Sequence, residues 1–186
     1  CFGCGAKGDI FTIYQELFNY TFLDAVKELS NRAGIKINFE QTSNHKEYDK
    51  HLKILEISAK WFEENLKVEN NLCIKYLQNR KLSNETIRTF RLGYSFNKDI
   101  SLHEYLKNLS FTDEEILKSN VAKLDKNKNI KDFFYKRLIF PINNINGKVV
   151  GFGGRVLDES NPKYINSPES HYFKKRGMLY NLNIAK

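Results

Sequence analysis

The residues best suited to chemistry lie near the carboxyl end, where glycines stand beside single cations at fixed spacing. One stretch runs from Gly151 to Arg155 with the sequence Gly-Phe-Gly-Gly-Arg, and the other, Pro162 to Glu169, reads Pro-Lys-Tyr-Ile-Asn-Ser-Pro-Glu. Glycines let a backbone approach a ligand closely, and single cations at fixed positions bind phosphate oxygens. This composition favours phosphate binding over core building and predicts a polyanionic ligand.

Two cations in these stretches have a clear physical rationale. Arg155 follows two glycines, which have no side chains to obstruct a phosphate, so its planar fork is suited to a bidentate contact. Lys163 follows Pro162, whose φ is fixed, and its compact ammonium suits a phosphate group. Asn166 and Ser167 are expected to add neutral hydrogen bonds nearby.

Composition and charge bound the class of protein. The chain has 186 residues and 41% hydrophobic content, enough for one domain or one domain with a small appendage. The net charge of +8 attracts anionic partners and favours nucleic acid modestly. With no signal segment and no apolar run near the roughly 18 residues of a membrane span, we expect no membrane association and a cytoplasmic location.

The first residues suggest half of a metal site. Cys1 and Cys4 form a Cys-x-x-Cys pair followed by Gly5, and two thiolates on such a turn can share one tetrahedral zinc. A closed site needs four ligands, so the other two are expected upstream of residue 1. Two reduced thiols or a redox pair remain alternatives. Cys73, between two apolar residues, is expected to pack in the core.

The first half of the chain is predicted to be helical. Helices are expected from Asp9 to about residue 18 and from Thr21 to a stop at Gly34. The polar segment 41–50 is interpreted as an interdomain linker. Beyond it, apolar periodicity predicts further helices, which run from Leu52 to Leu66, near 70–80, from Ser83 to about 92, and near 101–109 and 113–119.

The pattern then changes to strands. The basic stretch 123–131 is predicted to be a solvated loop. Strands are predicted at 138–142 and 148–152, joined by a hairpin at Asn146 and Gly147, and Pro141 indicates an edge strand or a bulge. Helices followed by a mainly antiparallel β portion predict an α+β fold with a partial zinc ribbon at the amino end.

Six motifs, taken in order, resemble the DnaG-type bacterial DNA primase along the whole chain. They are Cys1 to Phe11 (CFGCGAKGDIF), Tyr76 to Ser83 (YLQNRKLS), Phe134 to Ile142 (FYKRLIFPI), Gly151 to Leu157 (GFGGRVL), Pro162 to Glu169 (PKYINSPE) and Phe173 to Tyr180 (FKKRGMLY). The resemblance implies synthesis of short RNA primers on single-stranded DNA from nucleoside triphosphates, together with a replicative helicase.

The resemblance also implies a domain division. Residues 1–40 correspond to the end of a zinc-binding domain that helps select the template, 41–50 to a linker, and 51–186 to the first part of the RNA polymerase domain. In such enzymes a Toprim fold holds magnesium or manganese on acidic residues. No such acidic constellation occurs here, and the chain starts with Cys, so we expect a fragment, truncated at both ends, that is inactive alone.

By position, the resemblance assigns template or nucleotide contacts to Arg80, Arg155, Lys163 and Lys175, with Asn166 nearby. Tyr135 stands where the family often has arginine. Lys81 replaces a common glycine, so template contacts there are expected to shift. Tyr164 and Tyr172 are candidate base-stacking partners, with core or rim packing as the alternative. The competing hypothesis for the chain is a noncatalytic zinc-ribbon protein that binds nucleic acid through its charge.

Overall fold

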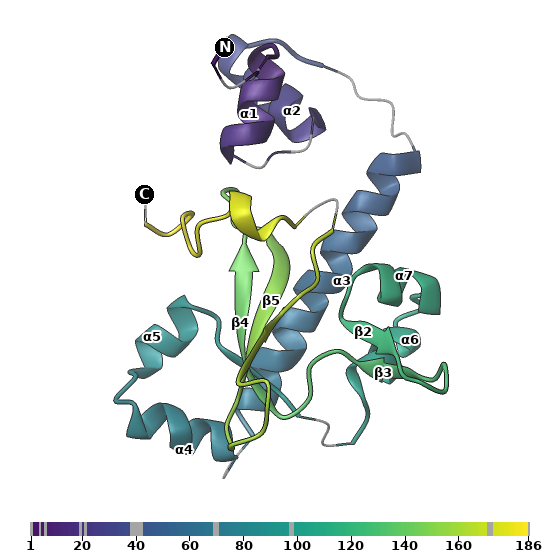
Figure 1. Cartoon of the computed structure of the whole chain (residues 1–186), viewed down its shortest axis with the longest axis vertical. Helices are drawn as coiled ribbons and strands as arrows, with labels where there is room; N and C mark the ends of the chain where they lie inside the picture. Colours follow the sequence, from purple (N-terminus) through teal and green to yellow (C-terminus); the bar gives the residue numbers. More distant parts are fainter. Residues whose placement is uncertain are drawn as a thin grey trace.

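The computed structural model describes residues 2–3, 5, 7–18, 20, 22–37, 43–68, 71–96, 99–170 and 173–185, and the side chains of 43–45 are not among those described. Its α-helices are α1 (Ile10–Phe18), α2 (Phe22–Ala33), α3 (Ser43–Leu66), α4 (Leu72–Asn79), α5 (Asn84–Thr89), α6 (Leu102–Asn108) and α7 (Asp113–Lys118). Its strands are β1 (Gly93–Ser95), β2 (Ala122–Leu124), β3 (Ile130–Asp132), β4 (Arg137–Asn143), β5 (Val149–Val156) and β6 (Tyr164–Asn166). A short 3-10 helix, η1 (Lys175–Gly177), follows (Figure 1).

Local signals position the first two helices as predicted. The Asp9 carboxylate accepts a hydrogen bond from the backbone N–H of Thr12 at 2.9 Å, which caps α1. Gly34 follows α2 with φ +67, and the N–H of Ile35 donates to the carbonyl of Ser30 at 2.9 Å. The predicted start at Thr21 lies outside the described residues.

Helix α3 begins at Ser43, so most of the segment interpreted as a linker is helical rather than irregular. The reason is an apolar stripe that the polar composition conceals. Tyr48 and Leu52 are each 8% exposed and pack against Val150 and Phe173. Where the domain boundary falls stays a prediction.

Strand order in the main sheet is β1-β4-β5-β6, and all three pairings are antiparallel. The hairpin between β4 and β5 was predicted, and Gly147 turns it with φ +76. Strands β1 and β6 were not predicted. Strand β4 lies inside the sheet, but its pairing with β1 ends at Ile139. Pro141 is therefore paired only on the β5 side, as at an edge, and a register shift follows between Ile142 and Asn143.

One face of this sheet, here called the α3 face, packs against helix α3 (Figure 1). Three fully buried rings meet there edge to face, with centroids 5.3 Å apart for Phe62 and Phe152 and 6.1 Å for Phe134 and Phe152. Trp61 packs on this core as predicted, 5.5 Å from the Phe62 ring. Gly93 is required in β1 because a Cβ would lie 2.5 Å from Cβ of Phe62.

The opposite face, here called the α4 face, is covered in part by α4 and α5. Cys73 and Leu77 are fully buried against Leu138 and Tyr94, so the core placement of Cys73 is confirmed. Ser83 caps α5 as predicted, accepting from Thr86 N–H at 3.0 Å. The remainder of the face carries the candidate site.

The predicted loop 123–131 is instead the hairpin of β2 and β3, paired antiparallel. Two short capped helices stand beside it. Thr112 and Glu115 form the predicted capping box of α7, and Ser101 and Glu104 form another at α6. Helices around antiparallel sheets make an α+β fold, as predicted. In the described part of the chain, no helix combines the length and apolar character that crossing a bilayer requires.

Candidate functional site

Two arginines from distant parts of the sequence meet on one tyrosine ring. Arg80 stands at the carboxyl end of α4, four residues after Tyr76, and its guanidinium carbon lies 5.4 Å from the ring centroid. Arg155 reaches the same ring from β5, at 4.5 Å. Packing of α4 on the sheet therefore joins two cations that the sequence separates.

Neutral groups alone hold Arg155 in place. Its Nε donates to the hydroxyl of Tyr164 at 3.2 Å, and its Nη1 donates to the carbonyl of Val156 at 3.1 Å. The Tyr164 ring centroid lies 5.8 Å from the guanidinium carbon. Among the described residues, no carboxylate forms an ion pair with Arg155 or Arg80. We call Tyr76, Arg80, Arg155 and Tyr164 the arginine–tyrosine cluster, which presents uncompensated positive charge beside aromatic rings.

A hollow of about 290 Å³ lies beside this cluster on the α4 face, with Gly153 in its wall. A Cβ on Gly153 would lie 3.1 Å from Oδ1 of Asn166, so the glycine keeps this space open. The rings of Tyr164 and Tyr180 border it and are 61% and 45% exposed. Exposed rings beside guanidinium groups are typical of surfaces that stack single-stranded bases and bind their phosphates.

Lys163 is exposed and precedes β6 directly, where its carbonyl accepts from the N–H of Val156 at 3.1 Å. Side chains alternate along a strand, and Arg155 pairs with Tyr164. Tyr164 and Asn166 therefore belong to the face of Arg155, whereas Lys163 and Ile165 belong to the α3 face. The structure brings Lys163 next to the cluster but around the edge of the sheet.

Lys175 is separated from the other predicted site residues. It begins η1, where its backbone N–H donates to Oε1 of Glu169 at 3.2 Å. Phe173, two residues earlier, packs against Gly151, four residues before Arg155 on β5. Of the five predicted contact residues, the structure thus groups Arg80, Arg155 and Asn166 on one face, sets Lys163 at the edge and places Lys175 apart.

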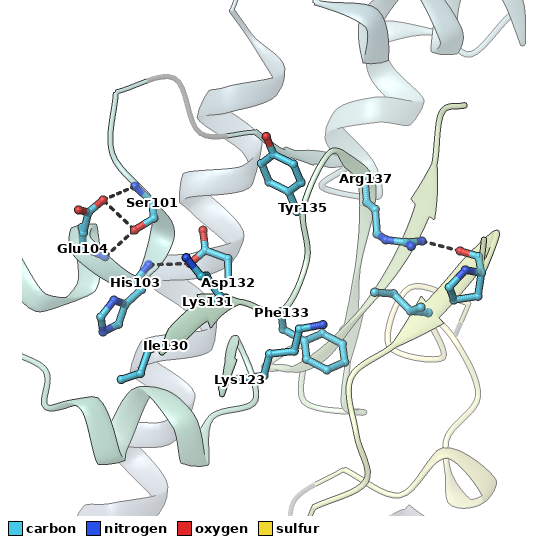
Figure 2. A pocket seen from close by; sticks show the side chains of 12 residues that line it. Ser101, His103, Glu104, Lys123, Ile130, Lys131, Asp132, Phe133, Tyr135 and Arg137 are labelled. Atoms are coloured by element: carbon cyan, nitrogen blue, oxygen red, sulfur yellow. Dashed lines mark hydrogen bonds between the residues drawn. The ribbon is translucent and has the colours of Figure 1, made fainter. Parts of the chain in front are cut away.

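Two further residues, one in the cluster and one behind it on the α3 face, carried no assigned role in the sequence analysis. Tyr76 has a signal that sequence alone offers, since it stands four residues before Arg80 on a helix. Arg137 has another, a single cation that opens an otherwise apolar strand. Its side chain is on the α3 face, only 8% of the residue is exposed, and burial lowers the pKa of its guanidinium (Figure 2).

The structure does not test the proposed metal ligands. Cys1 and Cys4 fall outside the described residues, as does Tyr172. Within the described residues, no group of three or more histidine, cysteine, aspartate or glutamate side chains is arranged to hold a metal ion. Sulfur donors suit zinc, and this pair supplies two of the four ligands that a closed site requires.

Comparison with known families accounts for most of the chain. Residues 61–186 match the family described as DNA primase catalytic core, N-terminal domain, and residues 1–45 match the CHC2 zinc finger. A DNA primase of Clostridium acetobutylicum is 39% identical over the whole chain, and one of Thermotoga maritima is 36% identical over the whole chain. The chain spans 31% and 33% of these two relatives, respectively.

Solved structures agree with this assignment. The Aquifex aeolicus primase, comprising zinc-binding and RNA polymerase domains, is 31% identical with a TM-score of 0.65, over 98% of this chain and 44% of that one. A DnaG primase catalytic domain bound to single-stranded DNA is 28% identical with a TM-score of 0.67, over 75% of this chain and 46% of that one.

Proposed function

Because this chain belongs to the DnaG-type DNA primase family, with the catalytic-core match at residues 61–186, we propose that it is part of a primase that synthesises RNA primers on single-stranded DNA. In this proposal its α4 face binds the template strand. The full-length enzyme is a DNA-directed RNA polymerase that uses nucleoside triphosphates and works with a replicative helicase. The family assignment favours this function over a noncatalytic zinc-ribbon protein.

The observation that carries the proposal is the arginine–tyrosine cluster. Two guanidinium groups share one ring, and no carboxylate of the described residues forms an ion pair with either. A phosphodiester supplies the missing negative charge, and bidentate guanidinium contacts suit its oxygens. An exposed Tyr164 ring next to Arg155 adds a stacking surface for a base.

The roles of metals in the proposal are limited by the residues present. Zinc would be held in part by Cys1 and Cys4, would stabilise the CHC2 zinc finger and would help that finger select the template. The magnesium or manganese used for nucleotidyl transfer has no cluster of ligands in the described residues. We therefore assign to this chain binding and orientation of the strand, and no chemical step.

The test uses the full-length primase and two variants of equal charge change. Arg155→Ala removes a cation from the cluster, and Lys60→Ala removes an exposed cation from α3. We expect Arg155→Ala to lower affinity for single-stranded DNA about tenfold, to reduce the slope of log affinity against log salt by about 0.7, and to reduce primer synthesis. Lys60→Ala should leave all three unchanged. Wild-type affinity and salt slope in Arg155→Ala and Arg80→Ala would remove the proposed role.

A further inference from the structure

A pair of lysines in the β2–β3 hairpin is placed where like charges repel. Lys123 and Lys131 are directly opposite in the antiparallel register, and both are exposed. Like charges at facing positions destabilise a strand pair. Among the described residues, neither lysine forms an ion pair, although the Lys123 ammonium lies 5.3 Å from the Phe133 ring centroid. An anion bound between them would remove this repulsion.

The hairpin forms one wall of a pocket of about 850 Å³ on the α3 face (Figure 2). Ile165 of β6 and the side chains of Phe133, Tyr135 and Arg137 also line it. The exposed ring of Tyr135 gives the pocket an aromatic surface beside its cations. Basic and aromatic side chains thus both line this pocket, as they do the arginine–tyrosine cluster.

The two carboxylates of the pocket are already engaged by helix α6. Asp132 accepts from the backbone N–H groups of Leu102 and His103, both at 2.9 Å. Glu104 accepts from the backbone N–H and the hydroxyl of Ser101, each at 2.8 Å (Figure 2). Both acids satisfy the first turn of α6, where negative charge is favourable. Neither lysine forms an ion pair with a described carboxylate, although the charge of Lys131 acts on the nearby Asp125 carboxylate.

Arg137 adds a buried charge at the side of the pocket nearest β6. Its Nη1 donates to the carbonyls of Pro162 at 3.0 Å, Gly154 at 3.4 Å and Lys163 at 3.5 Å. No described carboxylate forms an ion pair with it. Its hydrogen-bond partners are neutral, and the charge of the nearby Asp158 carboxylate offsets part of the cost of burying the guanidinium. A further anion beside it would offset more of that cost. Arg137 also holds in place the chain segment that carries Lys163.

The pocket and the cluster are neighbours around the edge of the sheet. Strand β6 is the edge strand and has only three residues. Arg155 and Tyr164 belong to one face, and Lys163 and Ile165 belong to the other, where Ile165 lines the pocket. A DNA strand that leaves the cluster and passes over β6 therefore meets Lys163 and then the lysine pair.

We propose that this pocket is a second binding segment for the sugar-phosphate backbone of single-stranded DNA, reached around β6 from the arginine–tyrosine cluster. The proposal rests on the template-binding function of that cluster. Lys123 and Lys131 bind phosphates, Lys163 bridges the two segments, and Tyr135 offers a ring to an unpaired base.

The experiment compares two double variants of the full-length primase. Lys123→Ala/Lys131→Ala removes the pocket lysines, and Lys126→Ala/Lys128→Ala removes two exposed lysines from the turn of the same hairpin. Affinity is measured across salt for short and long oligonucleotides, of about 4 and about 16 nucleotides, the range of single-strand site sizes. For the long one, the pocket variant should lose on the order of tenfold in affinity and about 1.4 in salt slope.

The outcomes separate the two proposals. We expect the short oligonucleotide to bind the pocket variant normally and the turn variant to match wild type at both lengths. Equal losses in both double variants, or no loss in the pocket variant, would overturn the second segment. Arg155→Ala should weaken both lengths. If it weakens neither while the pocket variant still loses affinity, the template-binding function of the cluster fails and the pocket stands alone.

Discussion

The two faces of the main sheet use neighbouring residues of one strand in opposite ways. On the α3 face, a Cβ added to Gly154 would lie 2.6 Å from Cδ1 of Phe134, a ring that is 2% exposed. On the α4 face, the nearest atom to a Cβ on Gly153 would be Oδ1 of the exposed Asn166, at 3.1 Å. One glycine permits close packing, and the other keeps the proposed binding surface open.

This difference corrects the simplest interpretation of the Gly-Gly-Arg motif. Two glycines before an arginine suggest space for a phosphate beside both glycines. Only Gly153, however, lies on the same face of the sheet as Arg155. Because side chains alternate along a strand, a motif of consecutive residues divides between two environments. The binding motif and the core motif overlap in sequence and separate in space.

The largest expected effect contrasts the two glycines directly. Gly154→Ala should lower the free energy of unfolding by about 2 to 3 kcal/mol, because the new methyl group meets a buried ring that has no room to move. Gly153→Ala should change it by less than about 1 kcal/mol, since its φ is not positive and the Asn166 side chain is free to rotate. Urea unfolding of both variants measures this. Equal losses would contradict the assignment of the faces.

Two arginines sharpen the comparison between a structural and a binding cation. Arg91 donates to Glu56 at 2.8 and 3.1 Å and to Glu63 at 2.9 Å, whereas Arg155 has only neutral partners. Arg91→Met should therefore cost about 1 to 2 kcal/mol of stability, because it leaves two partly buried carboxylates unpaired. It should leave the affinity for single-stranded DNA unchanged.

Arg155→Met is the matched variant, with the same side chain introduced. It keeps the packing on Tyr76 and should change the free energy of unfolding by less than about 1 kcal/mol, while DNA affinity falls. Thermal unfolding measures the stability of both variants, and DNA titration measures their affinity. If Arg91→Met lost DNA affinity without losing stability, pairing with carboxylates would not distinguish a structural arginine from a DNA-binding one.

Much of the fold could be predicted from sequence because its signals are local. Asp9, Ser83 and Thr112 each satisfy backbone N–H groups of a helix start within a few residues, and Gly34 ends α2 through its positive φ. The turn at Gly147 is equally local. Such features depend on neighbours in the chain and not on the rest of the molecule.

The missed elements depend on distant partners. Strands β1, β2, β3 and β6 have three residues each, too few for a periodic pattern, and form only because another strand is already placed beside them. The early start of α3 has the same cause, since Tyr48 is buried by Phe173 from the far end of the sequence.

The candidate site follows the same division. Glycines and single cations mark Arg155 and Lys163 locally, but the meeting of Arg80 with Arg155 requires α4 to pack on the sheet. The division of Lys163 from Tyr164 requires the register of β6. The sequence nominates the residues, and the pairing of strands decides which of them lie on the same face.

The smallest expected effect concerns the hydroxyl that orients Arg155. Tyr164→Phe keeps the ring and removes only the acceptor of the Nε hydrogen bond at 3.2 Å. Because one exposed hydrogen bond contributes about 0.5 to 1.5 kcal/mol, affinity for single-stranded DNA should fall about threefold. The salt slope should stay constant, since no charge is removed.

Tyr164→Ala also removes the ring, so it should lose about 1 to 3 kcal/mol of DNA-binding free energy if a base stacks there. The Phe and Ala variants should then differ in affinity for an ordinary oligonucleotide and bind an abasic oligonucleotide equally well. A Phe variant as weak as the Ala variant would show that the ring contributes nothing and that Tyr164 acts only by positioning Arg155.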